Sequence, residues 1–460
     1  MIQLSIWVGH DRMGTLQHDA ATNLFDFSYA DSWTRQRGSY PLSPQMPMFG
    51  GALAKQARAF SELPPELRSS IARAFFQNLL PEGQTLDVAA QANGVSKSNL
   101  AGLLVALGAE TAGALRVTLA DAIAGADNGG ALHPGLRPLP LSELSERIRR
   151  RSELPFSVWD GKVRLSIAGL QDKIAVFEDQ GALFLANGVG TASTVIVKPA
   201  PADPRFNDLP AVEHVCMRLA SAVGIAAART RILHIPEPVL LVERFDRRRS
   251  GNGVERLHIV DACQALGLAP ELKYERAYGD QEAVRHLRDG ASMSQLFGLA
   301  DSSPTPLAMR SALLDRAIFN VLIGNSDAHG KNWSFFIATQ AGLLTLAPAY
   351  DLVDVEAVAH EHMSASFAMG IGDAFHLEEL TPFEWASMAT QCNLAPRFLA
   401  ARLKMLCATL PRALQELWAD FTQQGVSAEL LAGMQHRLLR RCDAMVQLAS
   451  QVPKVPTKLL

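Results

Sequence analysis

The stretch "LIGNSDAHGKNWSFF" (residues 322–336) sets polar and glycine residues between an apolar helical segment and an aromatic segment with strand character. The preceding residues 306–324 carry apolar side chains at helical spacing, among them Leu314, Ile318 and Val321, which predicts a core helix that delivers the loop. An ordinary surface turn needs only a pair such as Asn-Gly or Pro-Gly. The number of polar side chains in this loop therefore indicates a chemical role.

Asp327 and Asn332 stand five positions apart in this loop, directly before a predicted strand. Protein kinases use this spacing in the catalytic loop, where the aspartate accepts the proton of the attacking hydroxyl and the asparagine holds magnesium. His329 and Lys331 would supply a further positive donor to the phosphoryl oxygens. The spacing thus predicts phosphoryl transfer.

A further carboxylate follows in "LAPAYDLVD" (residues 346–354), after the chain has passed through two predicted short strands. Such a hairpin returns the chain to the same edge, so Asp351 would meet Asn332 across a metal ion. Asp354 is a competing candidate. The alternative is that these aspartates only close turns or cap helices.

Lys198 ends the β-branched strand "STVIVK" (residues 193–198), where it is either an edge-strand gatekeeper or a phosphate ligand. Glu213 lies on the next predicted helix, the element from which a kinase pairs its lysine. Residues 163–177 predict two strands around a turn with Gly169, which is by itself a weak motif and fits a plain β-hairpin.

The composition bounds the protein class. The chain has 460 residues, 48% of them hydrophobic and 19% charged, with a net charge of −3, so we expect a soluble protein with two or three subdomains. Neither a signal peptide nor an apolar run of membrane-spanning length is evident. The five cysteines form no Cys-x-x-Cys pair, which favours reduced, buried thiols in a cytoplasmic protein without structural zinc.

The order of the predicted elements favours an α+β fold. Strands and then helices occupy residues 1–140, and a linker rich in Gly, Ala and Pro (residues 119–142) closes this first domain. Residues 141–250 are mostly strands with one helix, and residues 251–460 are dominated by helical periodicity. Only the end "VPKVPTKLL" (residues 452–460) is expected to be disordered.

The motifs together resemble the HipA family of serine/threonine kinases, the toxins of bacterial toxin-antitoxin pairs. The matching motifs are "FFQNLLPEG" (75–83), "LGAETAGALRV" (107–117), "LSIAGLQDK" (165–173), "TVIVKPA" (194–200), "EHVCMRLA" (213–220), "LVERFDR" (241–247), "CQALGL" (263–268), "KYE" (273–275), "GNSDAHGKNWSFF" (324–336) and "LAPAYDLV" (346–353). The resemblance covers nearly the whole chain and implies a protein-kinase-like, two-lobed α+β fold of the HipA type.

The resemblance also implies roles for residues at the matching positions. Asp327 would be the catalytic base, with Asn332 and Asp351 as magnesium ligands, and Ser166 would be autophosphorylated. The residues implied at the ATP site are Ser166, Ala168 and Gly169 of a loop over the phosphates, Lys198 with its partner Glu213, Glu243 and Phe245 of the adenine-reading hinge, and His329, Lys331, Asn332 and Asp351. The chain departs from the family before "CQALG", where the family commonly has Gln-Glu-Asp and only Asp261 is present. The resemblance therefore does not extend to the substrate or nucleotide contacts of this segment.

The implied cofactors are ATP and Mg²⁺, and the implied activity is that of a non-specific serine/threonine protein kinase. The implied partners are a HipB-like helix-turn-helix antitoxin, operator DNA through the antitoxin complex, and a translation-related protein substrate such as an aminoacyl-tRNA synthetase. No membrane partner is expected.

Two other classes of function remain open. A metal-dependent phosphohydrolase would use Asp327 and His329 with the later His360, Glu361 and His362. A non-catalytic co-repressor would contact DNA phosphates through the basic runs "ERIRRR" (146–151), "ERFDRRR" (243–249) and "HRLLRR" (436–441), although such runs are more often solvated faces.

Overall fold

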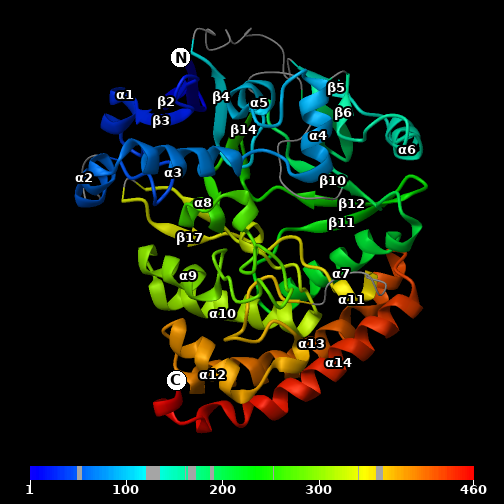
Figure 1. Ribbon diagram of the computed structural model, residues 1–460. Coiled ribbons are helices and arrows are strands. Elements are labelled where there is room, and N and C mark those ends of the chain that lie inside the picture. The colour runs from blue at the N-terminus through cyan, green and yellow to red at the C-terminus, as the bar shows by residue number, and fades with distance from the viewer. Residues whose placement is uncertain are drawn as a thin grey trace. The chain divides into compact units, whose positions relative to one another are not determined.

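The computed structural model describes residues 1–48, 54–120, 135–160, 162–163, 172–186, 191–251, 253–339, 341–358 and 366–460. The chain forms two compact units, each assembled from separate segments (Figure 1). Unit 1 comprises Met1–Ala202, Leu233–Pro270 and Phe335–Leu343, and unit 2 comprises Asp203–Ile232, Glu271–Ser334 and Leu344–Leu460. The three consecutive domains expected from the sequence stay a prediction.

Unit 1 begins with an antiparallel sheet in the order β3-β2-β1-β4. Its strands are β1 (Ile2–Val8), β2 (Asp11–Asp19), β3 (Leu24–Tyr29) and β4 (Leu115–Leu119). The helices between β3 and β4 are α1 (Asp31–Arg35), α2 (Ala54–Glu62), α3 (Pro65–Gln77), α4 (Gly83–Ala92) and α5 (Leu100–Leu107). Leu4, Ile6 and Leu16 are buried in this sheet, and α3 packs on β3. The small N-terminal sheet predicted from the sequence is therefore confirmed.

A second sheet of unit 1 has the neighbouring strands β12-β10-β8-β9-β5. These strands are β5 (Leu136–Pro138), β8 (Ile174–Asp179), β9 (Ala182–Ala186), β10 (Val195–Pro199) and β12 (Pro238–Glu243), and helix α6 spans Leu141–Arg149. Leu144 and Ile148 of α6 pack with Val195 and Val197 of β10 in one buried apolar cluster. The predicted linker thus contains an unexpected strand, because β5 pairs with β9.

Short elements complete the strand-rich part of the chain. They are β6 (Val158–Trp159), β7 (Lys162–Val163), β11 (Thr230–His234), β13 (Arg247–Ser250), β14 (Gly253–Arg256), β15 (Ile259–Asp261), β16 (Ser334–Ile337), β17 (Leu344–Leu346) and helix α8 (Ala262–Leu266). β6 pairs with β7, and β13 pairs with β14. β11 and β16 cross the boundaries between the units.

Unit 2 is mainly helical. Its helices are α7 (Leu209–Ala222), α9 (Met293–Gly298), α10 (Pro306–Ile323), α11 (Val355–Val358), α12 (Pro382–Gln391), α13 (Pro396–Gln423) and α14 (Ala428–Ala449). The 3₁₀ turns within the described ranges are η2 (Pro204–Phe206), η3 (Pro270–Leu272), η4 (Leu299–Ser302), η5 (Gly330–Asn332), η6 (Leu377–Glu379), η7 (Val452–Lys454) and η8 (Thr457–Leu459). α13 and α14 form a long helical pair, and both pack on α10. The predicted α+β fold class is confirmed.

The C-terminal end of the chain is more ordered than expected. Val452 is fully buried in η7, which packs on α13, so the predicted disorder of residues 452–460 is wrong. All five cysteines are buried and free, as predicted. Within the described ranges, no helix is both long enough and apolar enough to span a membrane.

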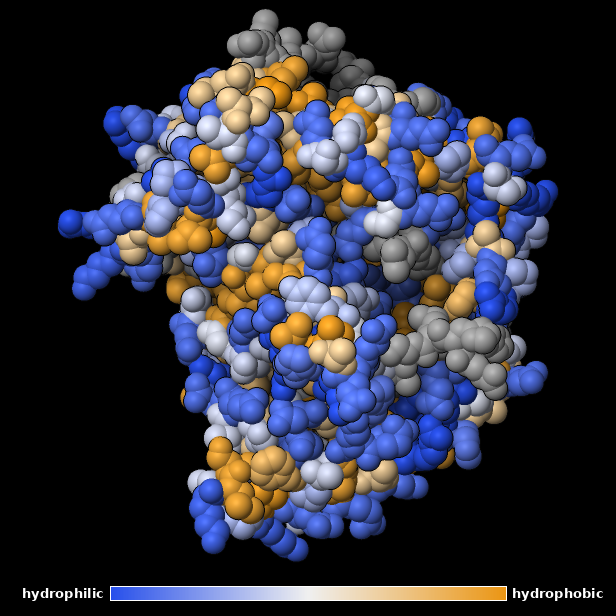
Figure 2. Space-filling model, in the orientation of Figure 1, coloured by the Kyte–Doolittle hydropathy of each residue, from blue (hydrophilic) through white to orange (hydrophobic). Residues whose placement is uncertain are grey.

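The exposed face in Figure 2 carries hydrophilic residues over much of its area, interrupted by small apolar patches. The large apolar side chains that the structure exposes are scattered along the chain, for example Leu67, Leu141, Leu307 and Leu439. Isolated exposed apolar residues are ordinary on protein surfaces. They give no argument for a docking surface.

Candidate functional site

The predicted catalytic loop follows the end of α10. Gly324 ends this helix in the left-handed conformation (φ +76°), and a Cβ atom there would lie only 2.4 Å from Nη2 of Arg441. A glycine satisfies both conditions at once. The backbone N–H of Asn325 then donates to the carbonyl of Asn320 at 2.8 Å, which closes the helix and fixes the direction of the loop.

The loop from Asn325 to Asn332 is buried except at one position, Asp327, which is exposed. Its backbone is held by bonds from elsewhere in unit 2: the N–H of Ala368 donates to the carbonyl of Ser326 at 2.8 Å, and Nε1 of Trp333 donates to the carbonyl of Ala328 at 3.2 Å. The Asp327 carboxylate is therefore presented to solvent by a fixed backbone, as a base for an incoming substrate requires.

Asn332 holds Asp327 in place through its own side chain. Its Nδ2 donates to the carbonyl oxygen of Asp327 at 2.9 Å, and the N–H of His329 donates to the same oxygen at 2.8 Å. The Asn332 amide nitrogen is thus used within the loop. Its amide oxygen has the ligand chemistry of a magnesium site.

Asp351 belongs to the same hydrogen-bonded assembly. Its carbonyl accepts a bond from Nδ2 of Asn325 at 3.4 Å, and the preceding residue Tyr350 donates through its hydroxyl to the carbonyl of Lys331 at 2.6 Å. Asp351 adopts φ +52°, an uncommon conformation for an aspartate that costs on the order of 1 kcal/mol and that functional sites often contain. Asp327, Asn332 and Asp351 are thus tied together within unit 2.

Asp354 has a different role. Its carboxylate is buried and forms ion pairs with Nε of Arg437 at 2.9 Å and Nη2 of Arg441 at 3.2 Å, both from α14. A carboxylate that neutralises two arginines anchors α14 to the segment before α11. These ion pairs argue against Asp354 as a metal ligand, and the metal-ligand role of Asp351 stays a prediction.

Arg316 lies beneath the loop and was not expected from the sequence. It is buried on α10, bonds through Nη2 to the carbonyl of Asn332, and lies 4.5 Å from the ring centre of Trp333. Burial lowers the pKa of Arg316 to about 10, which leaves the guanidinium charged at neutral pH. The signal in the sequence was a basic residue within a predominantly apolar helix.

His329 lies in the same loop as Asp327, in surroundings that disfavour the positive charge expected of it. Burial, followed by the charges of Lys273 and Lys331, lowers the pKa of His329 to about 3. Its ring packs edge-on against Tyr274, with 5.2 Å between ring centres. An imidazole with this pKa is neutral at physiological pH, which argues against His329 as a positive donor. Lys331 is also buried, and its role as a positive donor stays a prediction.

Lys198 lies on a central strand, because β10 pairs with β12 on one side and with β8 on the other. The edge-strand explanation of this lysine is therefore wrong. Val195 and Val197 point into the apolar cluster beneath α6, so the alternation of a strand places Lys198 on the opposite face of the sheet, where it is buried. Glu213 is buried on α7 in unit 2, and its pairing with Lys198 stays a proposal.

The predicted hinge residues follow β12. Glu243 is the last residue of this strand and is exposed, and Phe245 packs edge-on against Phe336 with 6.0 Å between ring centres. The backbone N–H of Arg244, between them, donates to the carbonyl of Thr194 at 2.9 Å. The hinge backbone is thus tied to the segment that enters β10.

A buried ionic network fixes the residues beside the hinge. Arg244 donates to both carboxylate oxygens of Asp246, at 3.0 and 2.7 Å, and Nη1 of Arg247 donates to Oδ2 of Asp246 at 2.9 Å. The N–H of Gly113 donates to the same Oδ2 at 2.7 Å, and Nη2 of Arg244 donates to the carbonyl of Thr111 at 3.1 Å. The loop before β4 is therefore bound directly to the hinge.

Some predicted site residues cannot be placed. Ser166, Ala168 and Gly169 lie outside the described residues, as do His360, Glu361 and His362 of the phosphohydrolase alternative. Asp261 has a structural role, because its side chain and that of Gln264 form a capping box at the start of α8. The described residues contain no cluster of three or more His, Cys, Asp and Glu side chains that would hold a metal ion.

Comparison with known proteins identifies the family. The model of the HipA-like C-terminal domain matches residues 165–414, and the model of the HipA N-terminal domain matches residues 4–118. The chain is 34% identical to the serine/threonine-protein kinase toxin HipA of Shewanella oneidensis, over 99% of this chain and 98% of the relative. The chain belongs to the HipA family.

The solved structures agree with this assignment. HipA of Shewanella oneidensis, in a complex with HipB and operator DNA, superimposes with a TM-score of 0.82 at 33% identity, covering 99% of this chain and all of that one. A kinase candidate of Sinorhizobium fredii, Y4mE, is 33% identical over 91% of this chain and 92% of its own length. The predicted HipA-type fold is confirmed.

The basic runs of this HipA-family chain are occupied by internal contacts. In α14, Arg441 is buried against Asp354 and Glu356, and in the run after β12, Arg247 is buried against Asp246. The more exposed members also have partners: Arg149 pairs with Glu237, Arg150 with Glu146 and Glu153, Arg248 with Glu255 and Arg440 with Glu356. These pairings weaken the case for direct contact with DNA phosphates.

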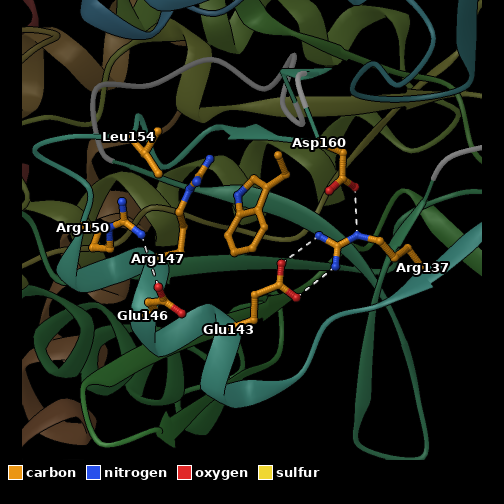
Figure 3. Close-up of a pocket in the computed structure, with 8 residues that line it drawn as sticks. Arg137, Glu143, Glu146, Arg147, Arg150, Leu154 and Asp160 are labelled. Carbon is orange, nitrogen blue, oxygen red and sulfur yellow. Dashed lines mark hydrogen bonds and ion pairs between the residues drawn. The ribbon is translucent and has the colours of Figure 1, made fainter.

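A pocket of about 180 Å³ in unit 1 is built mainly from residues of α6 and the β6 hairpin (Figure 3). Its charged groups already neutralise each other: Arg137 pairs with Glu143 and Asp160, both at 2.9 Å, and Arg150 pairs with Glu146. None of the residues predicted for the HipA catalytic site lines this pocket.

Proposed function

We propose that this protein is an ATP-dependent serine/threonine protein kinase that acts as the toxin of a toxin-antitoxin pair. The observation that carries the proposal is the arrangement in unit 2, where an exposed Asp327 stands on a loop whose hydrogen bonds also fix Asn332 and Asp351. Kinase activity in the relatives supports the same assignment, since the Shewanella protein is named as a kinase toxin.

Asp327 orients the substrate hydroxyl and accepts its proton while the oxygen attacks the γ-phosphorus of ATP. Asn332 and Asp351 would hold Mg²⁺, because amide and carboxylate oxygens are ligands that this ion prefers, and the bound ion would neutralise charge on the phosphate oxygens. The backbone beneath them is fixed by Arg316 and Tyr350, so the loop needs little rearrangement to act.

Residues of unit 1 bind the nucleotide in this proposal. Lys198, with Glu213 as its partner, holds the phosphates, and the backbone at Glu243 and Phe245 reads the adenine. The burial of Lys198 on a central strand is consistent with a fixed phosphate ligand. The loop of Ser166, Ala168 and Gly169 would cover the phosphates.

The partners follow from the relatives. The Shewanella HipA was solved with HipB and operator DNA. We infer that a HipB-like helix-turn-helix antitoxin neutralises this protein and links it to operator DNA. The protein substrate belongs to translation in this proposal, with an aminoacyl-tRNA synthetase as the first candidate, and the site of action is the cytoplasm.

A kinase assay tests the central claim. The purified protein, incubated with Mg²⁺, radiolabelled ATP and a cell extract, should transfer phosphate to protein, and Asp327→Asn and Asp351→Asn should each lose at least a hundredfold in rate. Asp289→Asn, a change at an exposed aspartate of unit 2, is the matched control and should retain full activity. Full activity in both site variants would exclude the kinase assignment.

Autophosphorylation has a separate test. Intact-mass spectrometry after incubation with ATP and Mg²⁺ should show one added phosphate on the wild type and none on Ser166→Ala. The phosphate adds almost two negative charges beside the bound nucleotide, so the modified protein should lose ATP affinity. Ser142→Ala, at an exposed serine, is the control. A phosphate retained by Ser166→Ala would place the modification elsewhere.

A further inference from the structure

Tyr274 makes direct contact with the proposed base. Its hydroxyl donates a hydrogen bond to Oδ1 of Asp327 at 2.7 Å, although the two residues are 53 positions apart in the sequence. Both residues belong to unit 2. The bond therefore comes from a segment that is separate from the catalytic loop and for which no chemical role was predicted.

The segment that carries Tyr274 is attached to the loop on both sides of this residue. The carbonyl of Lys273 accepts a bond from the N–H of Gly330 at 2.8 Å. The N–H of Glu275 donates to the carbonyl of Ala368 at 2.9 Å, and Ala368 in turn bonds to Ser326 of the loop. The residues on both sides of Tyr274 are thus connected to the catalytic loop, Lys273 directly and Glu275 through Ala368.

The space around Tyr274 also restricts its movement. A Cβ atom at Gly290 would lie 1.8 Å from the carbonyl oxygen of Tyr274, so only glycine permits this close approach. The tyrosine ring packs edge-on against His329, and the buried carboxylate of Glu275 binds Nε of Arg288 at 2.6 Å and the N–H of Gly370 at 2.7 Å. These contacts hold the Tyr274 hydroxyl in a fixed orientation toward Asp327.

We propose that Tyr274 is a positioning residue for the phosphoryl transfer, an inference that rests on the function proposed above. An exposed aspartate carboxylate rotates freely unless one oxygen is fixed. The bond from Tyr274 fixes Oδ1, and in this proposal the carboxylate takes up the proton of the substrate hydroxyl through Oδ2. That proton transfers as the substrate oxygen bonds to the γ-phosphorus and the bond from that phosphorus to ADP breaks. The tyrosine keeps its own proton throughout.

The first test is kinetic and uses Tyr274→Phe, which keeps the ring and its packing and removes only the hydroxyl. We expect kcat to fall on the order of tenfold with little change in KM for ATP, because orientation of the base is lost while nucleotide binding is not. Tyr278→Phe is the matched control, since Tyr278 is 57% exposed. A wild-type kcat in Tyr274→Phe, or a loss confined to KM, would overturn the proposal.

The second test does not depend on enzyme activity. The chain has five tyrosines, so the ¹⁹F spectrum of protein labelled with 3-fluorotyrosine is simple, and Tyr274→Phe identifies the resonance of Tyr274. Asp327→Asn should shift this resonance and leave that of Tyr278 in place, because it replaces a charged acceptor by a neutral one. An unchanged Tyr274 resonance would show that the bond is absent. An inactive wild type with the expected shift would instead refute the kinase function.

Discussion

Removal of Asp246 should destabilise the protein far more than removal of an exposed ion pair of similar length. Asp246→Ala leaves Arg244 and Arg247 without their closest counter-charge, and these arginine side chains are only 2% and 1% exposed. Breaking a buried pair at one partner costs about 3–5 kcal/mol, because the remaining charge stays desolvated. Glu110, 3.4 Å from both arginines, offsets part of this cost.

The expected shift in thermal unfolding follows from this free energy. At about 2 °C per kcal/mol, the value for large domains, the melting temperature of Asp246→Ala should fall by roughly 6–10 °C. Arg248→Ala provides the control, since it breaks the Arg248–Glu255 pair, whose side chains are 63% and 46% exposed. Such a surface pair contributes about 0–1 kcal/mol, which predicts a shift of at most about 2 °C.

Differential scanning calorimetry of both variants at neutral pH measures these shifts, and circular dichroism at 222 nm verifies that each variant is folded at the start. Equal shifts for Asp246→Ala and Arg248→Ala would refute the reasoning, because burial would then not decide the cost of losing the charge. A stabilised Asp246→Ala would refute it as well.

Further predictions concern nucleotide binding, acid stability and the end of α10. Lys198→Ala should weaken binding of a non-hydrolysable ATP analogue in isothermal titration, and Glu213→Ala should produce part of the same loss; unchanged affinity in both would make these residues structural only. Burial raises the pKa of Glu110, but Arg256, Arg247 and Arg244 outweigh it and hold the pKa at about 2. Because this folded-state pKa is depressed, the contribution of Glu110 is complete above the ordinary glutamate pKa and is lost as pH falls from about 4.5 to 2, so Glu110→Gln should flatten the acid-unfolding curve there. Gly324→Ala should lower stability by more than about 1 kcal/mol, since its φ is positive and Arg441 occupies the space of the new Cβ; urea unfolding that matches the wild type would contradict this.

The helix α10 and the polar loop after it were predictable because their information is local. The spacing of Asp327 and Asn332 and the helix before them lie within one continuous stretch, and the structure places that helix at Pro306–Ile323. Tyr274 and Arg316 were not predictable in the same way, because their contacts with the loop depend on tertiary packing. A tyrosine or an arginine in the sequence gives no indication of which distant atom it will reach.

Other errors have equally physical causes. Strand β5 lies in a stretch rich in Pro and Gly, which predicts a linker. It is a strand because its three residues pair with the edge of β9, and this pairing depends on tertiary structure. The position of Lys198 on an edge or a central strand depends on sheet order, which the residues of one strand do not encode. The basic runs suggested a nucleic-acid surface until the structure paired them with carboxylates that lie far away in the sequence, as Arg437 and Asp354 do.

The ionic network beside the hinge has a consequence for how such chains evolve. Gly113 and Thr111 belong to the segment matched by the N-terminal family model, whereas Arg244 and Asp246 belong to the one matched by the C-terminal model. A recombination event that exchanged one segment between distant relatives would bury arginines opposite a loop that no longer complements them. We therefore expect a change on either side of the network to require a matching change on the other.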